Sequence, residues 1–405
     1  MEKISFIRKT VLSMFCSFGI CNLLFGGITW VETTGSAGWL GRGAHTSVVF
    51  DGKMWVMGGN NFSGSTICQD VWSSTNGVNW TQEAVSTAWS KRWDHTSVVY
   101  DNKMWIIGGI YNSILYNDVW YSTDGAGWTQ ATSSAVWVAR GSHASVVFDN
   151  KMWILGGAAD ATGCNDVWYS TDGANWSQAT AAAGWSKRFS HSALVFDNKM
   201  WVIGGFASVD GNDCNDVWYS TDGANWFQAT AAAGWAPRDF FGATVFDNKM
   251  WVFGGEDTLN YFNDVWYSTD GANWTQATGT VGWAVKAAHT ALSFDNKMWV
   301  IGGANNSASY SDVWYSTGTG VEEKLNIKNP STTLRASQNP FVQTTVVSCE
   351  CSVDSKTNIK IYDITGKLVE ETKDNTVCKT LKPGIYFVKV SGYKPIKITK
   401  MGEIK

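Results

Sequence analysis

The chain has 405 residues, a formal net charge of −4, 14% aromatic residues and only 16% charged residues, against roughly 25% charged residues in ordinary soluble domains. So many aromatic residues and so little net charge exclude a disordered chain, and the acidic balance excludes nucleic-acid binding by bulk electrostatics. The 25 tryptophans are far more than a globular chain of this length needs.

A basic and then apolar segment opens the chain. Lys3, Arg8 and Lys9 precede an apolar run over residues 11–25, and two glycines follow it. The run is too short for a spanning helix, so the pattern predicts a signal peptide over residues 1–27. The alternative is a lipoprotein anchored through Cys21, although residues 18–20 make a poor lipobox. We expect no transmembrane span after removal of the signal.

Two phrases recur six times up to residue 318. Gly-Gly pairs that follow an apolar run begin at nearly even intervals, at Gly58, Gly108, Gly156, Gly204, Gly254 and Gly302. An Asp-Val-Trp phrase starts at Asp70, Asp118, Asp166, Asp216, Asp264 and Asp312, and the interval from each of the first five to the next Gly-Gly is constant. All variation in length therefore falls between the Gly-Gly and the following Asp, which predicts an exposed loop there.

Each copy predicts four short strands. In the second copy they cover residues 97–100, 104–107, 118–123 and 128–131, with a tight turn at Asp101-Asn102. Residues 104–107 form a continuous apolar run, which is typical of a strand buried on both faces. Four antiparallel strands repeated six times predict a β-propeller.

The ends of the array predict closure of the ring. The sixth copy stops after its third strand, over residues 313–316, and the missing fourth strand stands at the other end of the array, over residues 28–32. Trp30 precedes Gly58 by the same interval as Trp80 precedes Gly108. The N-terminal strand should therefore complete the last blade and remove the exposed sheet edges.

The paired glycines, the later Asp-Val-Trp-Tyr and the following Trp resemble Kelch repeats over about residues 28–318. The resemblance implies an all-β, six-bladed Kelch-type β-propeller. This chain departs from the Kelch pattern where it has Trp55, Trp105 and their equivalents in place of the usual Tyr. The segment Ser170–Trp176 also resembles the Asp-box of sialidases in a shortened form, and we interpret its Asp as a cap of its own turn.

All five histidines occupy one repeat position: His45, His95, His143, His191 and His289, with Phe241 in the fifth copy. A ring of histidines suggests a metal on the axis, but a sixfold ring spreads its ligands too far apart. We therefore predict that each His satisfies local backbone groups, and we predict no metal and no cofactor.

A basic residue stands three positions before each of these residues: Arg42, Arg92, Arg140, Arg188, Arg238 and Lys286. In Kelch propellers this position lies near the mouth of the central channel. A ring of guanidinium groups would suit carboxylate or sulfate groups on a ligand. The alternative is that each basic group pairs with an acidic or carbonyl group inside its own blade.

Catalysis needs different residues in different roles, and therefore needs broken symmetry. The copies differ at Trp93 and Asp94, at Asp239, Phe240 and Phe241, and in the variable loops, which include Asn60, Asn61, Phe62, Tyr111, Asp160, Asp210, Asp213, Glu256, Asp257 and Tyr261. This mixture of aromatic rings, amides and carboxylates favours a binding surface over a catalytic dyad. Galactose oxidase has a related propeller, but its copper site needs two His, two Tyr and a Cys, a set that this chain does not offer. We therefore leave an enzyme open and favour none.

The cysteines give little indication of function. Cys68, Cys164 and Cys214 share one position, which Tyr116, Phe262 and Tyr310 fill in the other copies, and we expect free buried thiols there. In the tail, Cys378 could pair with Cys349 or Cys351 if the protein is exported.

The composition changes after residue 318, beyond which there is no Trp. Residues 319–334 have the character of a linker, and residues 335–405 alternate apolar and polar residues in short runs, which predicts a small β-sandwich. Asn339-Pro340, residues 361–367, residues 381–389 and the basic last strand together resemble the C-terminal sorting domain of type IX secretion. The resemblance implies the type IX machinery as a partner, acting on residues 335–405, and a Gram-negative bacterium of the Bacteroidota type. The alternative is a plain adhesion or spacer module.

The sequence thus predicts an exported protein, secreted or on the outer-membrane surface, that binds a glycan or a protein. The predicted binding residues are Arg42, Arg92, Trp93, Asp94, Arg140, Arg188, Arg238, Asp239, Phe240, Glu256, Asp257 and Lys286. The alternatives are a glycan-active enzyme, which would require carboxylates with Tyr or Arg on one face, and a purely structural surface protein. Of the 25 tryptophans, 24 recur at four repeat positions and are scaffold residues, so Trp93 is the first to test for a ligand.

Overall fold

A computed structural model describes residues 28–159, 162–278 and 281–317, together with seven strands of the tail. Every element in this described part is a strand. The chain divides into two compact units, Met1–Val321 and Glu322–Lys405, which are described separately below. The predicted signal peptide and residues 319–333 of the predicted linker lie outside the described residues.

The strands of the first unit form antiparallel sheets that follow the sequence repeat. One sheet contains β2 (Thr46–Phe50), β3 (Lys53–Met57), β6 (Val71–Ser74) and β7 (Thr81–Ala84), and its loop holds the hairpin of β4 (Asn60–Asn61) and β5 (Thr66–Ile67). The next contains β8 (Thr96–Tyr100), β9 (Lys103–Tyr111), β10 (Ile114–Ser122) and β11 (Thr129–Thr132).

The following two copies share a nine-stranded sheet. Its strands are β12 (Ala144–Phe148), β13 (Lys151–Ala158), β14 (Gly163–Ser170), β15 (Ser177–Thr180), β16 (Arg188–Phe189), β17 (Ser192–Phe196), β18 (Lys199–Ala207), β19 (Asn212–Ser220) and β20 (Phe227–Thr230). The short strand β16 pairs with both β14 and β18 and so joins the two copies.

Two four-stranded sheets complete the first unit. The fifth copy forms β21 (Gly242–Phe246), β22 (Lys249–Glu256), β23 (Tyr261–Ser268) and β24 (Thr275–Thr278). The sixth forms β25 (Thr290–Phe294), β26 (Lys297–Ile301) and β27 (Val313–Thr317), and its fourth strand is the N-terminal β1 (Thr29–Thr34). β1 pairs antiparallel with β27, with Trp30 opposite Ser316, which confirms the strand predicted to come from the start of the array.

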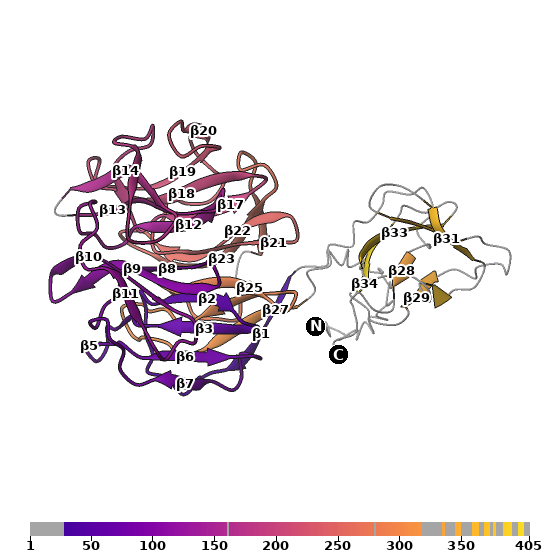
Figure 1. The fold of residues 1–405 in the computed structure, drawn as a ribbon, viewed down its shortest axis with the longest axis horizontal. Coiled ribbons are helices and arrows are strands. Elements are labelled where there is room, and N and C mark those ends of the chain that lie inside the picture. The colour runs from indigo at the N-terminus through magenta and orange to yellow at the C-terminus, as the bar shows by residue number, and fades with distance from the viewer. Residues whose placement is uncertain are drawn as a thin grey trace, which may run out of the picture. The chain divides into compact units, whose positions relative to one another are not determined.

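The first strands of these copies surround a common centre in a propeller-like arrangement (Figure 1). β2, β8, β12, β17, β21 and β25 each contact the next, and β25 contacts β2 again. Beside them, one residue of each copy donates its backbone N–H to the carbonyl of the equivalent residue in the preceding copy. These hydrogen bonds, of 2.7–3.1 Å, form a closed cycle. Its members, here called the mouth ring, are Ala44, Asp94, Ser142, Ser190, Phe240 and Ala288.

Local sequence explains the hairpins. Asp101 and Asn102 both have positive φ, of 48° and 54°, as the tight turn between β8 and β9 requires. Asn and Asp tolerate this conformation best among residues with a side chain, and Gly52 takes the second position in the first copy. Met104, Ile106 and Ile107 on β9 are fully buried, as the apolar run predicts.

Tryptophan pairs hold each copy together. The Trp that precedes each first strand makes an edge-to-face contact with the Trp at the fourth strand, with ring centroids 4.5–6.1 Å apart. In the sixth copy Trp30 supplies the second ring, against Trp283. The turn glycines fit neighbouring copies together, since a Cβ on Gly125 would lie 2.1 Å from the ring of Trp55.

The described strands of the second unit form two small sheets. β28 (Leu334–Ala336), β29 (Thr345–Cys349) and β32 (Thr376–Val377) form one, and β30 (Ile359–Asp363), β31 (Leu368–Thr372), β33 (Gly384–Val390) and β34 (Ile396–Lys400) form the other. β30 and β34 lie where alternation of polar and apolar residues predicts strands. The side chains of the tail cysteines lie outside the described part, so their pairing stays a prediction.

Candidate ligand-binding site

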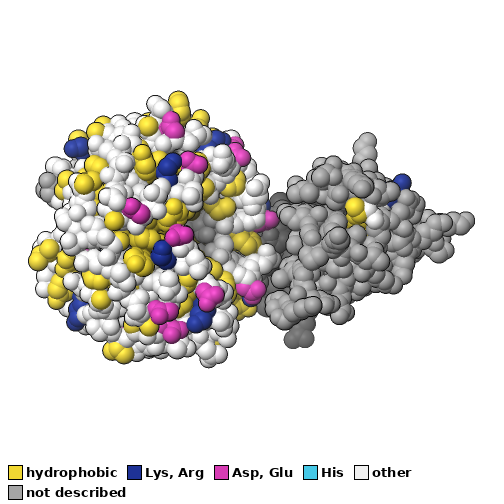
Figure 2. Space-filling model, viewed as in Figure 1, with side chains coloured by type: hydrophobic (Ala, Val, Ile, Leu, Met, Phe, Trp, Pro, Cys, Tyr) yellow, Lys and Arg dark blue, Asp and Glu magenta, His cyan; other side chains and the backbone are white. Residues whose placement is uncertain are grey.

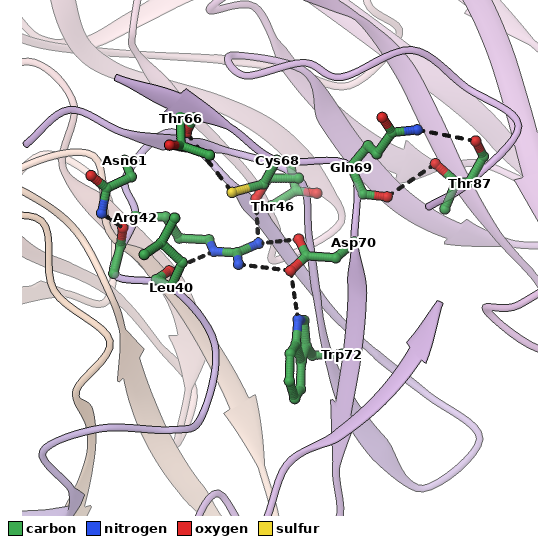
Figure 3. Close-up of polar contacts among 12 residues, drawn as sticks. Leu40, Arg42, Thr46, Asn61, Thr66, Cys68, Gln69, Asp70, Trp72 and Thr87 are labelled. Carbon is green, nitrogen blue, oxygen red and sulfur yellow. Dashed lines mark hydrogen bonds and ion pairs between the residues drawn. The ribbon is translucent and has the colours of Figure 1, made fainter. Parts of the chain in front are cut away.

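Arg42 is buried and bonded within its own copy (Figure 3). Its Nη1 and Nη2 donate to the two carboxylate oxygens of Asp70 at 2.6 and 2.9 Å. Nη1 also donates to the carbonyl of Gly58, and Nε donates to the carbonyl of Leu40. The indole N–H of Trp72 donates to the same carboxylate at 2.8 Å. The guanidinium thus bonds two backbone carbonyls and a carboxylate in a bidentate pair.

The same network recurs around the ring. The basic and acidic partners are Arg92 with Asp118, Arg140 with Asp166, Arg188 with Asp216, Arg238 with Asp264, and Lys286 with Asp312, at 2.6–2.7 Å. Burial alone would raise the pKa of Asp70, but the hydrogen bonds and charge of Arg42 hold it below its ordinary value. Arg92 also lies 4.5 Å from the ring centroid of Tyr116, and Arg238 lies 4.3 Å from that of Phe262, which is within cation–π range.

These side chains do not form the exposed basic ring that would bind an anionic ligand. The residues Arg42, Arg92, Arg140, Arg188, Arg238 and Lys286 are each 0% exposed. On the face drawn in Figure 2, the Lys and Arg side chains that do reach the surface lie apart from one another. The structure has the alternative arrangement, in which each basic group pairs inside its own copy.

The cysteine position lies beside this network. Cys68 and Cys214 are thiols, and burial raises their pKa. Cys68 is buried as expected, whereas Cys164 and Cys214 are half-buried.

The histidines line the central channel. His95 Nε2 lies 3.2 Å from Thr46 Oγ1 of the preceding copy, and His143 Nε2 lies 2.8 Å from Thr96 Oγ1. These two bonds join side chains of neighbouring copies. His289 Nε2 also accepts from the backbone N–H of Gly242 at 3.3 Å, so a backbone partner is present as predicted but comes from the neighbouring copy. Burial, and then the charge of Arg140, lower the pKa of His143 to about 3, so the imidazole is neutral. Within the described residues, no group of three or more His, Cys, Asp or Glu is placed to hold a metal ion.

The mouth ring is one of the positions at which the six copies differ in side chain. Its six members all have positive φ, between 47° and 55°. In the second copy this position holds Asp94, whose Oδ2 accepts a hydrogen bond from Ser142 Oγ at 2.6 Å. In the fifth it holds Phe240, which is half-buried. A narrow pocket of about 130 Å³ lies inside the ring and reaches the histidines.

A larger cleft opens beside the mouth ring. Its volume is about 690 Å³, and its walls are Phe62, Ser63, Trp93, Phe240, Glu256, Tyr261, Ala287, Ala288, Ala304, Asn305, Asn306 and Ser307. Trp93 meets Phe62 edge to face, with ring centroids 5.8 Å apart. The hydroxyl of Tyr261 donates to Asn306 Oδ1 at 3.0 Å. The cleft is thus an aromatic-walled hollow with amide and carboxyl groups, and its size is typical of small-ligand sites.

Glu256 is the carboxyl residue among those that line this cleft, and further carboxyl groups lie near Glu256 outside the lining. Asp239 lies opposite Glu256 in a two-residue antiparallel bridge, so both side chains lie on the same side of the backbone pair. Burial first, and then the charges of Asp213, Glu256 and Asp94, raise the pKa of Asp239 to about 8. Burial also raises the pKa of Asp94 to about 7 and that of Glu256 above its ordinary value. At neutral pH Asp239 is therefore largely protonated.

Asp257, another predicted binding residue, lies in the variable loop of the fifth copy. Its carboxylate accepts hydrogen bonds from the backbone N–H groups of Leu259 and Asn260 at 2.8 and 2.6 Å. It caps its own loop, and it is not among the residues that line the cleft.

Comparison with known families agrees with this architecture. A profile described as the KLHDC2/KLHL20/DRC7 Kelch-repeats domain matches residues 28–205 and 142–347. The chain belongs to the Kelch-repeat family. Its Kelch repeats carry the paired glycines and the Asp-Val-Trp phrase on which the resemblance rests, so the departure from Tyr to Trp at Trp55 and its equivalents does not take it out of the family.

The tail of this Kelch protein matches a second profile. Residues 339–401 match the secretion system C-terminal sorting domain, which indicates secretion by the type IX system to the cell surface or beyond, as in Bacteroidota. The search of curated proteins finds no match. In the described part of the chain, no helix is long and apolar enough to cross a membrane.

The structure brings together residues that the sequence could only name separately. Trp93, Phe240 and Glu256, three of the predicted binding residues, line one cleft with Phe62 and Tyr261 from the variable loops. The sequence does not point to residues 305–307 of the sixth copy, because nothing in a single loop of small polar residues signals a site. Closure of the Kelch ring is what places the sixth copy beside the first.

Proposed function

We propose that this chain is an exported binding protein whose Kelch unit is a six-bladed propeller closed by β1. The closed cycle of inner strands supports six blades, because β16 only bridges two four-stranded sets within the nine-stranded sheet. The two small sheets of the tail support a C-terminal β-sandwich. The domain boundaries follow as a signal over residues 1–27, a propeller over 28–318, a linker over 319–334 and a sorting domain over 335–405.

We propose further that the propeller binds a glycan in the cleft beside the mouth ring. The observation that carries this proposal is the confinement of the aromatic cleft to one sector of a ring that is otherwise nearly sixfold. Trp93 and Phe62 offer apolar ring faces, and Asn305 and Asn306 offer amide donors and acceptors. Sugar rings combine apolar C–H faces with many hydroxyl groups, so they fit walls of this mixed kind.

The protonation of Asp239 suits a hydroxyl-rich ligand. A protonated carboxyl both donates and accepts hydrogen bonds, whereas a carboxylate only accepts them. Glu256, opposite Asp239, adds further acceptors at the wall of the cleft.

A glycan array probed with the whole chain tests the proposal, with Trp93→Ala as the site variant. Phe189→Ala is the matched control, since Phe189 holds the equivalent repeat position but does not line the cleft. We expect retention of specific glycans by the wild type and by Phe189→Ala, and at least a tenfold loss of affinity in Trp93→Ala. Equal retention by both variants would place the ligand elsewhere, and no retention of any glycan by the wild type would favour a structural role.

A glycan-active enzyme is the second candidate, and the pair of Asp239 and Glu256 is the observation that favours it. Two carboxyl groups whose surroundings hold one of them protonated at neutral pH are the pattern of a general acid beside a base or nucleophile. Release of reducing ends from bound glycans, abolished in Asp239→Asn with binding retained, would establish this activity. Binding without any turnover would leave the chain a binding protein.

The proposed localisation can be tested separately from ligand binding, through the sorting domain. We propose that the signal over residues 1–27 carries the chain across the inner membrane and that residues 335–405 carry it across the outer membrane. Deletion of residues 335–405 should trap the propeller in the periplasm, as measured by cell fractionation. Normal delivery of the truncated chain to the surface would contradict the role of the tail.

A further inference from the structure

We propose that the cleft selects glycans that carry a protonated amine. This inference rests on the proposed glycan site and names the chemical class that the site favours. It rests on three observations: the signs of the charges around the cleft, one buried carboxyl without a partner, and the aromatic walls.

The charged groups around the cleft are of one sign. Glu256 lines it, Asp239 lies opposite Glu256, and Asp94 belongs to the mouth ring next to Trp93. None of the residues that line the cleft is Lys or Arg. Arg238 and Lys286 directly precede Asp239 and Ala287 in the chain, and both are 0% exposed and paired with Asp264 and Asp312. A cation on the ligand therefore meets no competing positive charge.

Asp239 is a buried carboxyl that lacks a counter-charge. It is 8% exposed, and within the described residues its carboxyl makes no hydrogen bond or ion pair with another residue. The groups that raise its pKa beyond the effect of burial are all carboxyls, namely Asp213, Glu256 and Asp94. An ammonium group bound nearby would lower the pKa of Asp239 and let its carboxyl ionise as the partner of that cation.

The aromatic walls favour the same charge. Trp93, Phe62, Phe240 and Tyr261 all line the cleft, and the faces of such rings attract cations through their quadrupole. Acidic groups and ring faces within one cleft thus act in the same direction on an ammonium. The same groups repel the negative charges of uronic acids and sulfated sugars, which are the ligands that an exposed ring of arginines would bind.

Titration calorimetry with the whole chain tests the inference. The probes are a glucosamine tetramer, the same tetramer fully N-acetylated, and a galacturonic acid tetramer, at a pH where the free amines are protonated. We expect the glucosamine tetramer to bind about tenfold more tightly than the acetylated one, with the galacturonic acid tetramer weakest. The preference should shrink at high salt, because salt screens charge interactions.

Asp239→Asn and Glu256→Gln keep the shape of the site, and neither new side chain can ionise beside a bound ammonium group. Each should reduce the preference for the amine to less than about threefold, because the affinity for the glucosamine tetramer falls more than that for the acetylated tetramer. Asp210→Asn is the matched control, an exposed aspartate of a variable loop outside the cleft lining, and it should keep the full preference. Thermal melting of each variant verifies that it is folded.

The outcomes separate the two proposals. Binding of all three tetramers without preference, lost in Trp93→Ala, would overturn the selection for amines and keep the glycan site. If both Asp239→Asn and Glu256→Gln kept the full preference for the amine, the proposal that these two carboxyls recognise the ammonium would be overturned. The selection for amines would also be overturned if the chain bound none of the tetramers and the glycans that it retains on the array carried no amine.

Discussion

Single residues in this chain owe their roles to what surrounds them rather than to their type. Arg140 is identical in kind to an exposed guanidinium that binds a carboxylate ligand, yet its donors bond Asp166 and two backbone carbonyls. Asp166 and Asp239 are both partly or fully buried aspartates, but one has a cation beside it and the other has only carboxyls. The first holds its charge at neutral pH and the second holds its proton.

Replacement of Arg140 by Ala should destabilise the propeller by about 3 kcal/mol, because it leaves Asp166 without the partner that compensates its burial. Arg140→Lys should cost less, since Lys286 fills the same position against Asp312 in the sixth copy. Urea unfolding followed by fluorescence measures both values. An unchanged unfolding midpoint in Arg140→Ala, combined with lost glycan binding, would show that the arginine serves the ligand instead.

Asp239 makes stability depend on pH in the direction opposite to an ordinary paired aspartate. Its pKa is about 8 when folded and about 4 when unfolded, so between these values the folded state holds a proton that the unfolded state has lost. Stability from this group is therefore complete at low pH and is lost as the pH rises through 8. Melting temperatures of Asp239→Asn and wild type should diverge in favour of the variant from about pH 5 to pH 9. Parallel curves would show that the raised pKa is absent.

At the scale of the element, the turn between the third and fourth strands of a copy packs against the preceding copy. The loop after the third strand is organised by its Asp, since Asp124 Oδ1 accepts from the N–H groups of Ala126 and Gly127 at 2.9 and 2.8 Å. The shortened Asp-box therefore has the structural role inferred from sequence. The loop presents Gly125 to the ring of Trp55 in the preceding copy.

Gly125→Ala should cost clearly more stability than Gly52→Ala. Both glycines have positive φ, of 77° and 67°, so both variants carry the same kind of backbone strain, about 1 kcal/mol. Only at Gly125 would the new Cβ meet another side chain, 2.1 Å from Trp55, whereas nothing lies within 4 Å at Gly52. Overpacking should add about 1–3 kcal/mol. Urea unfolding measures both variants, and equal losses would contradict the proposed contact between copies.

At the scale of the molecule, the repeat predicts most of the fold and little of the site. Strand positions follow from recurring apolar runs and turns, and the lone strand at residues 28–32 predicts its pairing with the last copy. The pairing of the buried basic residues could have been predicted from the sequence, because each basic residue at this repeat position has its Asp partner 26 or 28 positions later. The cleft was not visible, since Phe62, Trp93, Glu256 and Asn305 meet only when the ring closes.

The ring of neutral histidines should make the whole propeller sensitive to acid. The pKa of His45, His143, His191 and His289 is lowered to about 3 when folded, with burial as the main cause. The unfolded chain therefore binds more protons than the folded one between about pH 3 and 6.5, and stability is lost as the pH falls through that range. His143→Phe, which copies Phe241 of the fifth repeat, should lose less stability than wild type between pH 6.5 and 4 by thermal melting. An identical loss in the variant would contradict the buried neutral state.

The most direct measurement of the proposed function is the structure of the whole chain in complex with a glycan that it retains. We expect the sugar to lie in the cleft beside the mouth ring, with one sugar ring against Trp93 and an amine, where present, near Asp239. A sugar bound in the central channel against the histidines, or on a blade edge away from Trp93, would contradict the site proposed for this Kelch propeller.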